Sequence, residues 1–319
     1  MIKPFTGALL LALQSCSLFA QPYPIKPIRY IIPFPPGGGQ DLVGRALAPR
    51  LSEAMGQQVL IDNRPGGGTI LGAELAARSA PDGYTIFMGS NTSLSINPVL
   101  HAKLPYDALR DFAPITRIAT AANMLVVHPS LPVRSVKEFT TFAKARPDQL
   151  NYGSSGTGTP AHLAGVLFND IASVKLVHVP YKGSAGALTA IVSGEMQLMF
   201  GTLPSSLPFV RSQRLRALAV TSAKRSPITP DLPAIAETFP GYEAVTWYGV
   251  VAPANTPPAI LGRLHSEFTK ILNSTEFKTW LLNQGAESAP SSPEELAAQI
   301  KREIQIYGPI VRKSGMKAD

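Results

Sequence analysis

The sequence predicts an α/β fold with largely parallel sheets, large enough for one big domain or two of ordinary size. Short apolar runs alternate with segments in which apolar residues recur at helical spacing, and this alternation is typical of strands followed by helices. The chain has 319 residues, of which 45% are hydrophobic and only 16% are charged, so it can bury a substantial core. Its 30 prolines and 26 glycines fall between the periodic segments and mark turns.

The first strand is expected at Ile28–Pro33, where an apolar run stops, and the first helix at Asp41–Met55. In that helix Val43, Leu47 and Leu51 continue to Met55 as one apolar stripe. Pro49 lies inside the stripe and is expected to kink the helix.

The later elements follow from the same two patterns, and the region after the last strand is rich in helices. Further strands are expected at Val59–Asp62, Thr85–Met88, Met124–His128, Leu150–Tyr152, Lys175–Val179, Gln197–Phe200, Leu215–Thr221 and Val245–Ala252. Further helices are expected at Thr69–Arg78, Val136–Arg146, Thr159–Asn169, Ala185–Val192, Pro258–Leu272, Glu276–Asn283 and Pro293–Ser314. A helical block at the end of an α/β chain often packs back onto the first domain, which would make that domain discontinuous.

The first twenty residues, "MIKPFTGALLLALQSCSLFA", have the features of a signal peptide. Lys3 is their only charge, an apolar run covers Ala8–Leu13, and the small residue Ala20 precedes Gln21. We therefore expect cleavage after residue 20 and export to the periplasm. Cys16 in "LQSC" leaves a lipid-anchored form as the alternative, although Gln14 fits the lipoprotein pattern poorly.

The formal net charge of +8 is spread along the chain. The densest basic group, "VRSQRLRA", has no aromatic residues between its arginines, whereas a nucleic-acid site would concentrate both. A mild positive field suits a small anionic ligand, and we expect no nucleic-acid partner.

Four junctions between an expected strand and an expected helix combine glycines with a residue that can cap a helix. They are "PPGGGQD" (Pro35–Asp41), "NRPGGGT" (Asn63–Thr69), "YGSSGTGTP" (Tyr152–Pro160) and "VPYKGSAG" (Val179–Gly186). Because a helix N-terminus has unpaired N–H groups and glycine lets an anion approach them, such loops can hold a carboxylate or a phosphate. The alternative for each single loop is that its glycines only permit a tight turn.

Nucleotide and catalytic motifs fail at specific positions. "GGGTIL" has Leu71 where a dinucleotide-binding loop needs its last glycine, and "GSSGTGTP" lacks the lysine of a P-loop. A nucleophile elbow centred on Ser155 would need glycine in place of Thr157. The five histidines have no metal-ligand spacing, so we expect no metal and no cofactor.

Five segments together resemble the Bug family, the extracytoplasmic solute receptors of tripartite tricarboxylate transporters. They are "YPIKPIRYIIPFPPGGGQD", "VLIDNRPGGGTILGAELAARSAPDGYTIFMGS", "NYGSSGTGTPAHLAG", "VPYKGSAGALTAIVSGEMQLMF" and "LRALAVTSAKRSP", and the similarity covers almost the whole chain after residue 22. The resemblance implies a two-domain periplasmic binding protein of the Venus-flytrap, type II-like class, with a ligand cleft between the domains. It implies a first domain of 21–123 plus 246–319 and a second of 124–245.

The resemblance also implies that main-chain amides of the glycine loops hold a small carboxylate. The ligand would be a dicarboxylate, an acidic amino acid or an aromatic acid. Candidate ligand-binding residues of the first domain are Gly37, Gly38, Gly39, Gln40, Asn91, Thr92 and Trp247. Trp247 would form an apolar wall together with Tyr248. Candidates of the second domain are Ser155, Thr157, Gly158, Thr159, Tyr181, Gly201 and Thr202.

We expect a monomeric receptor that is not an enzyme, has no catalytic residue, and delivers its ligand to the membrane subunits of such a transporter. Two alternatives stay open at this point. The same binding chemistry could serve a sensor kinase, and a secreted hydrolase could use Ser154 or Ser155 as its nucleophile.

Overall fold

The computed structural model describes residues 23–37, 39–181, 183–314 and 316, so the expected signal peptide and Cys16 lie outside the described residues. The strands are β1 (Ile28–Ile32), β2 (Val59–Asn63), β3 (Thr85–Ser90), β4 (Phe112–Val127), β5 (Leu150–Ser154), β6 (Leu176–Pro180), β7 (Leu198–Thr202), β8 (Arg216–Val220), β9 (Val245–Pro253) and β10 (Glu287–Ser288). The helices are α1 (Gly39–Met55), α2 (Ile70–Ala77), α3 (Asn97–Leu100), α4 (Val136–Lys144), α5 (Pro160–Ala172), α6 (Ser184–Val192), α7 (Leu203–Arg211), α8 (Pro258–Asn273), α9 (Thr275–Asn283) and α10 (Pro293–Ser314). Shorter helical turns are η1 (Gly67–Thr69), η2 (Thr92–Ile96) and η3 (Ile235–Glu237).

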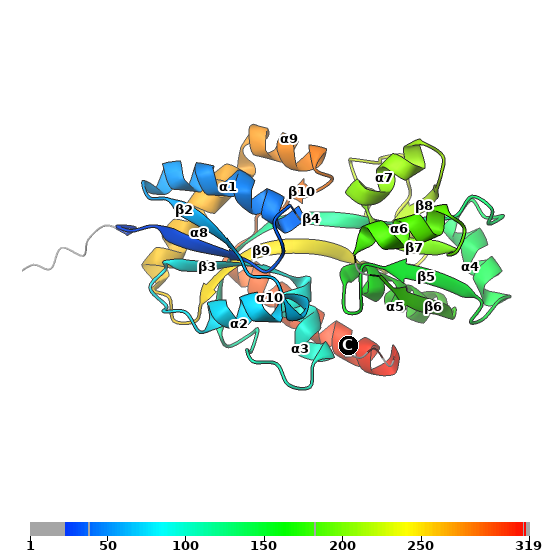
Figure 1. Ribbon diagram of the computed structural model, residues 1–319, viewed down its shortest axis with the longest axis horizontal. Helices are drawn as coiled ribbons and strands as arrows, with labels where there is room; N and C mark the ends of the chain where they lie inside the picture. Colours follow the sequence, from blue (N-terminus) through cyan, green and yellow to red (C-terminus); the bar gives the residue numbers. More distant parts are fainter. Residues whose placement is uncertain (1–22, 38, 182, 315, 317–319) are drawn as a thin grey trace, which may run out of the picture.

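Two lobes share one mixed sheet, and β4 and β9 run between them (Figure 1). The strand order is β2-β1-β3-β9-β4-β7-β5-β6, with β8 and β10 also paired to β4. The ladders of β1 and β5 with their neighbours are parallel, as expected. The expectation of largely parallel pairing is wrong for β4 and β9, which are antiparallel to every strand they pair with.

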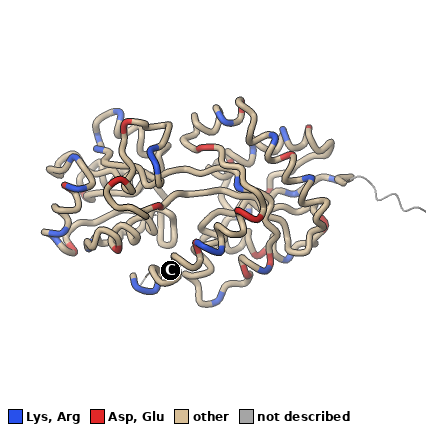
Figure 2. The backbone as a smooth tube through the Cα atoms, turned by 180° about the vertical axis from the view of Figure 1, so that it is seen from behind, with Lys and Arg blue, Asp and Glu red and all other residues tan. Residues whose placement is uncertain are grey.

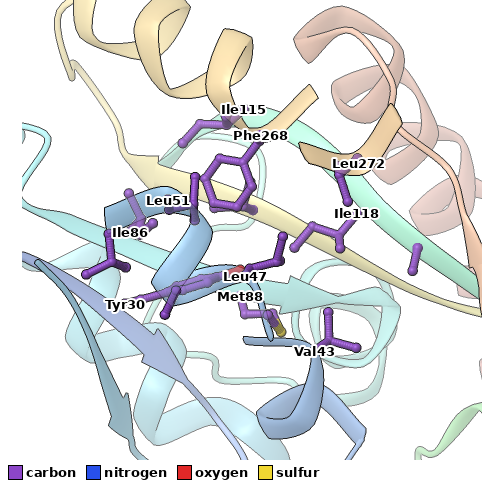
Figure 3. Close-up of a cluster of buried hydrophobic side chains, with 14 of the residues drawn as sticks. Tyr30, Val43, Leu47, Leu51, Ile86, Met88, Ile115, Ile118, Phe268 and Leu272 are labelled. Carbon is purple, nitrogen blue, oxygen red and sulfur yellow. The ribbon is translucent and has the colours of Figure 1, made fainter. Parts of the chain in front are cut away.

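The first lobe, on the left in Figure 1, contains β1 to β3, α1 to α3 and the C-terminal helices α8 to α10. On one face of its sheet the stripe of α1 packs against the strands and α8 (Figure 3). Val43, Leu47 and Leu51 there contact a core that includes Tyr30 and Phe268. The helix α1 continues through Pro49 to its end. On the opposite face, α2 and α10 cover a second core that includes Phe87, Trp247 and Leu296.

The second lobe, on the right in Figure 1, contains β5 to β8 and α4 to α7. One core lies under α4 and α5 around Phe139, Phe168 and Phe200. A second core lies under α6 and α7 around Leu188 and Met199. Both faces of this part of the sheet are therefore covered by helices.

The strand β4 changes partners between Ala122 and Asn123. Residues up to Ala122 pair with β9, and residues from Asn123 onward pair with β7. Its partner β9 begins at Val245. We therefore propose that the domains divide here, as 21–123 plus 246–319 and 124–245.

Charged residues are scattered over both lobes, with lysines and arginines interspersed with acidic residues rather than gathered in one stripe (Figure 2). None of the helices in the described part of the chain is long and apolar enough to cross a membrane.

Candidate functional site

A cavity of about 440 Å³ lies between the two lobes, beside the crossing strands β4 and β9. Its size is in the range of small-molecule sites. The helix α1 forms one wall, and the starts of α6 and α7 form the opposite one. The lining residues are Gly39, Leu42, Val43, Ala121, Ser184, Thr202, Pro204, Ser205, Thr246, Tyr248, Gln284 and Ala286.

The glycine loop before α1 is held by the carboxylate of Asp41, which is only 1% exposed. This carboxylate accepts hydrogen bonds of 2.8 Å each from Gly37 N, Arg45 Nε and Asn63 Nδ2. Burial alone would raise the pKa of the Asp41 carboxyl, but the bonds from Arg45, Gly37 and Asn63 outweigh it, so its pKa lies below the usual value. Gly38 lies outside the described residues.

The start of α1 is close to the hydroxyl of Tyr248. A Cβ added to Gly39 would lie 3.3 Å from Tyr248 Oη, so glycine leaves space between the backbone and this hydroxyl. Burial raises the pKa of Tyr248 to about 12, so the hydroxyl keeps its proton at neutral pH and can donate it in a hydrogen bond. Together with the unpaired N–H groups of the first helical turn, it offers donors to an anion.

On the second lobe, Thr202 and Ser205 supply hydroxyl groups to the cavity. Their Oγ1 and Oγ atoms lie 2.7 Å apart, and Ser184 adds a third hydroxyl at the start of α6. Gly201 is buried just before Thr202, and a Cβ there would lie 2.3 Å from Ser206 Oγ. A side chain at position 201 would therefore have to displace the hydroxyl of Ser206 on α7.

The loop between β5 and α5 is built from internal hydrogen bonds. Thr159 Oγ1 donates to Gly156 O at 2.7 Å, and Gly158 N donates to His162 Nδ1 at 3.3 Å. Burial and the neighbouring His178 lower the pKa of His162 to about 3, so its ring is neutral and can accept that bond. The predicted residues Ser155, Thr157, Gly158 and Thr159 do not line the cavity; Ser155 O accepts a bond from Gly183 N, which precedes the lining residue Ser184.

Ser154 and His178 form the contact that a serine hydrolase would need, with Ser154 Oγ 2.6 Å from His178 Nε2. Ser154 is fully buried, however, and its hydroxyl also bonds to the backbone of Gly156. The imidazoles of His178 and His162 stack with centroids 3.5 Å apart. The cluster of Ser154, His162 and His178 holds the loop between β5 and α5 in place, and the buried hydroxyl of Ser154 is not an accessible nucleophile.

Trp247 was expected to form an apolar wall of the ligand site, but it does not line the cavity. Its side chain is fully buried in the core under α10, and its Nε1 donates to Glu303 at 2.8 Å. Because neighbouring residues of a strand point to opposite faces, Thr246 and Tyr248 line the cavity and Trp247 faces the other side.

Three further predicted residues also have structural contacts. Asn91 is 1% exposed and its Nδ2 donates to Val245 O at 2.9 Å, which ties the end of β3 to the start of β9. Thr92 begins η2, and Tyr181 packs against the core under α6. None of the three lines the cavity.

Several polar side chains, none of which lines the cavity, have buried atoms without a hydrogen-bond partner among the described residues. They are Gln40 Oε1, Ser90 Oγ, Asn91 Oδ1, Ser206 Oγ and both polar atoms of Asn123. In the ladders Ser90 lies opposite Tyr248, and directly opposed residues share a face. Asn123 lies opposite Thr202 in the same way. Since buried polar atoms are nearly always paired in proteins, the unpaired atoms of Ser90 and Asn123 favour a polar ligand or ordered water on this face of the sheet.

Sequence reasoning missed Leu42, Ser184, Ser205 and Gln284. Ser184 stands inside the quoted "VPYKGSAG" junction, from which Tyr181 had been selected as the candidate. Ser205 lies on α7, which two prolines concealed. Among the residues that the structure describes, no group of three or more His, Cys, Asp or Glu side chains could hold a metal ion.

The model of the tripartite tricarboxylate transporter family receptor matches residues 43–316. Protein BugT of Bordetella pertussis is 34% identical over 300 residues, which cover 93% of this chain and 92% of BugT. The structure of Rpa4515 of R. palustris with adipate is similar with a TM-score of 0.81 and 36% identity, covering 92% of this chain and 99% of that one. The structure of MatC from Rhodopseudomonas palustris with bound malate has a TM-score of 0.77 and 28% identity, covering 91% of this chain and all of that one.

Proposed function

Because the chain belongs to the tripartite tricarboxylate transporter receptor family and has the two-domain α/β fold of periplasmic binding proteins, we propose that it captures a small carboxylate in the cavity between its lobes. Members of this family are solute receptors. The similar proteins solved with adipate and malate support a carboxylate as the ligand.

The observation that carries the proposal is the set of neutral donors around the cavity. The start of α1 and Tyr248 supply donors from the first lobe, and Ser184 and Thr202 supply hydroxyls from the second. Hydrogen bonds to a charged group contribute about 1.5–3 kcal/mol each, and micromolar affinity needs about 8 kcal/mol. Four to six such bonds reach that value after the cost of association, without a metal or a catalytic group.

Two contacts between the lobes support binding by closure. A Cβ on Gly285 of the first lobe would lie 2.4 Å from Pro204 of the second. At a second place where the lobes meet, a Cβ on Gly158 of the second lobe would lie 2.6 Å from Leu100 of the first. A ligand that bonds to both lobes favours the arrangement in which they touch, so it shifts the population toward the closed form.

The closed form would deliver its ligand to the membrane subunits of a tripartite tricarboxylate transporter, as a monomeric receptor without enzymatic activity. A sensor kinase is the alternative partner. The proposed location is the periplasm, reached by way of a signal peptide in residues 1–20, with a lipid anchor at Cys16 as the alternative.

The test is isothermal titration of the ligand-stripped chain from Gln21 onward against dicarboxylates, tricarboxylates, acidic amino acids and aromatic acids. We expect one-to-one binding at micromolar concentration or tighter. Thr202→Val removes a hydroxyl and should weaken binding at least about tenfold, because a bond to a charged group is lost. Thr141→Val, at an exposed position of α4, is the matched control and should bind like the unaltered protein.

Two results would count against the proposal. If the folded protein binds no member of the panel, a small carboxylate is excluded as its ligand. If Thr202→Val binds the ligand with unchanged affinity, this cavity is not the binding site.

A further inference from the structure

A second cavity, of about 360 Å³, lies on the other face of the crossing strands, and we call it the back cavity. Thr120 of β4 and Val245 of β9 line it, whereas their neighbours Ala121 and Thr246 line the first cavity. Because successive residues of a strand point to opposite faces, the sheet separates the two cavities. The walls of the back cavity are α10 of the first lobe and α5 of the second, which both lie below the crossing strands in Figure 1.

Arg117 lines the back cavity and is a cation without a carboxylate partner. It is half-buried, and its Nε and Nη1 donate to Ala289 O at 2.9 Å and to Gln299 Oε1 at 2.7 Å, which are both neutral acceptors. It forms no ion pair with any residue that the structure describes. Burial lowers the pKa of Arg117 more than the acidic groups around it raise it. Since a guanidinium has more N–H groups than these two bonds use, Arg117 can also hold an anion.

The acidic side chains that line the back cavity are already bonded or lie at exposed positions. Glu303 is buried, and its carboxyl accepts bonds from Trp247 Nε1 and from a glutamine of its own helix. Asp170 forms an ion pair with a lysine of α10. Glu243 is exposed, and so is Arg302, which carries the opposite charge. None of these carboxyls pairs with the guanidinium described above, so its charge is left for a ligand.

Both helical walls of the back cavity carry apolar residues. Leu167 and Ile171 line it from α5, and Ile306 and Ile310 line it from α10. Ile171 is 37% exposed and Ile306 is 47% exposed, although both are large apolar side chains. A hydrocarbon chain between the two helices would remove this surface from water.

We propose that the back cavity is a second ligand site, which takes a monocarboxylate with an unbranched hydrocarbon chain, such as octanoate. Arg117 holds the carboxylate, because a guanidinium matches a carboxylate in charge and in geometry. Ile171 and Ile306 cover the hydrocarbon chain from opposite lobes. The site differs from the first cavity, whose described lining residues include no charged side chain.

A ligand in the back cavity should also strengthen binding in the first cavity. It touches α5 and α10, so it favours the arrangement in which these helices approach each other. In the same arrangement Gly285 of the first lobe approaches Pro204 of the second. Two ligands that favour one arrangement of the lobes raise each other's affinity. This coupling rests on the proposed function, whereas binding in the back cavity does not.

Three molecules with the same hydrocarbon chain and different head groups test the ligand class. Octanoate, 1-octanol and octylammonium are titrated calorimetrically into the ligand-stripped chain from Gln21 onward. Octanoate should bind at least about tenfold more tightly than 1-octanol, because only octanoate gives Arg117 a hydrogen bond to a charged group. Octylammonium should bind most weakly, since its charge has the same sign as that of Arg117. The proposal is wrong if octanoate does not bind, or if either of the other two binds as tightly.

Variants of the lining locate the site. Arg117→Gln removes the positive charge, and Ile306→Asp replaces apolar surface by a negative charge, so each should weaken octanoate binding at least about tenfold. Ile25→Asp is the matched control and should bind octanoate like the unaltered protein, since Ile25 is 53% exposed and does not line the back cavity. Circular dichroism shows whether each variant is folded. If Arg117→Gln does not fold, Ile306→Asp decides, because its exposed position leaves the core intact. Unchanged octanoate affinity in Ile306→Asp would overturn the assignment of the site.

Titration of octanoate in the presence of a saturating diacid separates the two cavities. The diacid is the panel member that binds most tightly to the first cavity, and it should strengthen octanoate binding about fivefold. Competition between the two ligands would show that octanoate occupies the first cavity, which would overturn the proposal. An unchanged octanoate affinity would overturn the coupling alone. If no member of the panel binds, the proposed function fails, and the head-group series and the lining variants still decide whether the back cavity is a site.

Discussion

Replacing Asp41 by asparagine tests whether this carboxylate holds the glycine loop. The buried carboxylate accepts bonds from Gly37 N, Asn63 Nδ2 and Arg45 Nε. The first two are bonds to a charged group inside the protein, at about 1.5–3 kcal/mol each. The third involves Arg45, whose side chain is 52% exposed, so its ion pair adds only about 0.5 kcal/mol. Asparagine keeps one acceptor oxygen and turns its amide group toward another donor, so Asp41→Asn should cost about 2–4 kcal/mol of stability.

The assay is urea unfolding followed by circular dichroism at neutral and acidic pH. Because the folded pKa of Asp41 lies below its usual value of 3.8, its stabilising contribution is complete above that value and is lost as pH falls through the lowered pKa. The difference in the free energy of unfolding between the unaltered protein and Asp41→Asn should therefore become smaller in strong acid. The control Asp82→Asn changes an exposed ion pair with Lys26 and should stay within about 0.5 kcal/mol. A loss below about 0.5 kcal/mol for Asp41→Asn at pH 7, or a difference that does not narrow in acid, would refute the reasoning.

Two further variants test the buried carboxylate of Glu303 and the contact between the lobes at Gly158. Burial raises the pKa of Glu303 above 4.5, so the unaltered protein loses stability as pH rises from 4.5 through the raised pKa. Glu303→Gln can still accept a bond from Trp247, so its melting temperature should rise relative to that of the unaltered protein between pH 4.5 and 7.5. A decrease in the melting temperature of the variant relative to the unaltered protein over this range would contradict this reasoning. Gly158 has φ +74 and faces Leu100, so Gly158→Ala should weaken ligand binding about tenfold in isothermal titration, and adding Leu100→Ala should restore part of the affinity. Full affinity in Gly158→Ala would mean that this contact is not needed for closure.

The regular elements could be predicted from sequence wherever one pattern dominated. The apolar stripe of α1 and the long periodic helix α10 were predicted nearly to the residue. The strand β4 was expected only from Met124, because its first twelve residues, "FAPITRIATAAN", mix proline, threonine and small residues and have no continuous apolar run. Residues Phe112–Ala122 pair with β9, a partner more than a hundred residues away, and such pairing leaves no local pattern.

The candidate site was predictable in outline and not in detail. Of the residues predicted to bind ligand, Gly39 in the first glycine junction and Thr202 at the end of β7 line the cavity. The donors of Gly158 and Asn91 are taken up by His162 and Val245, which depends on tertiary packing that one sequence does not reveal. The residues of α1, α6 and α7 that face the cavity could be selected only when the two lobes were placed together.

A crystal structure with the most tightly binding diacid bound tests the central claim most directly. We predict ligand density in the cavity between the lobes, with one carboxylate at hydrogen-bonding distance from Tyr248 and the start of α1. The other carboxylate should contact the hydroxyls of Ser184 and Thr202. Density elsewhere, for example in the cavity of about 360 Å³ beside Arg117 and Glu303, would contradict the assignment of this site.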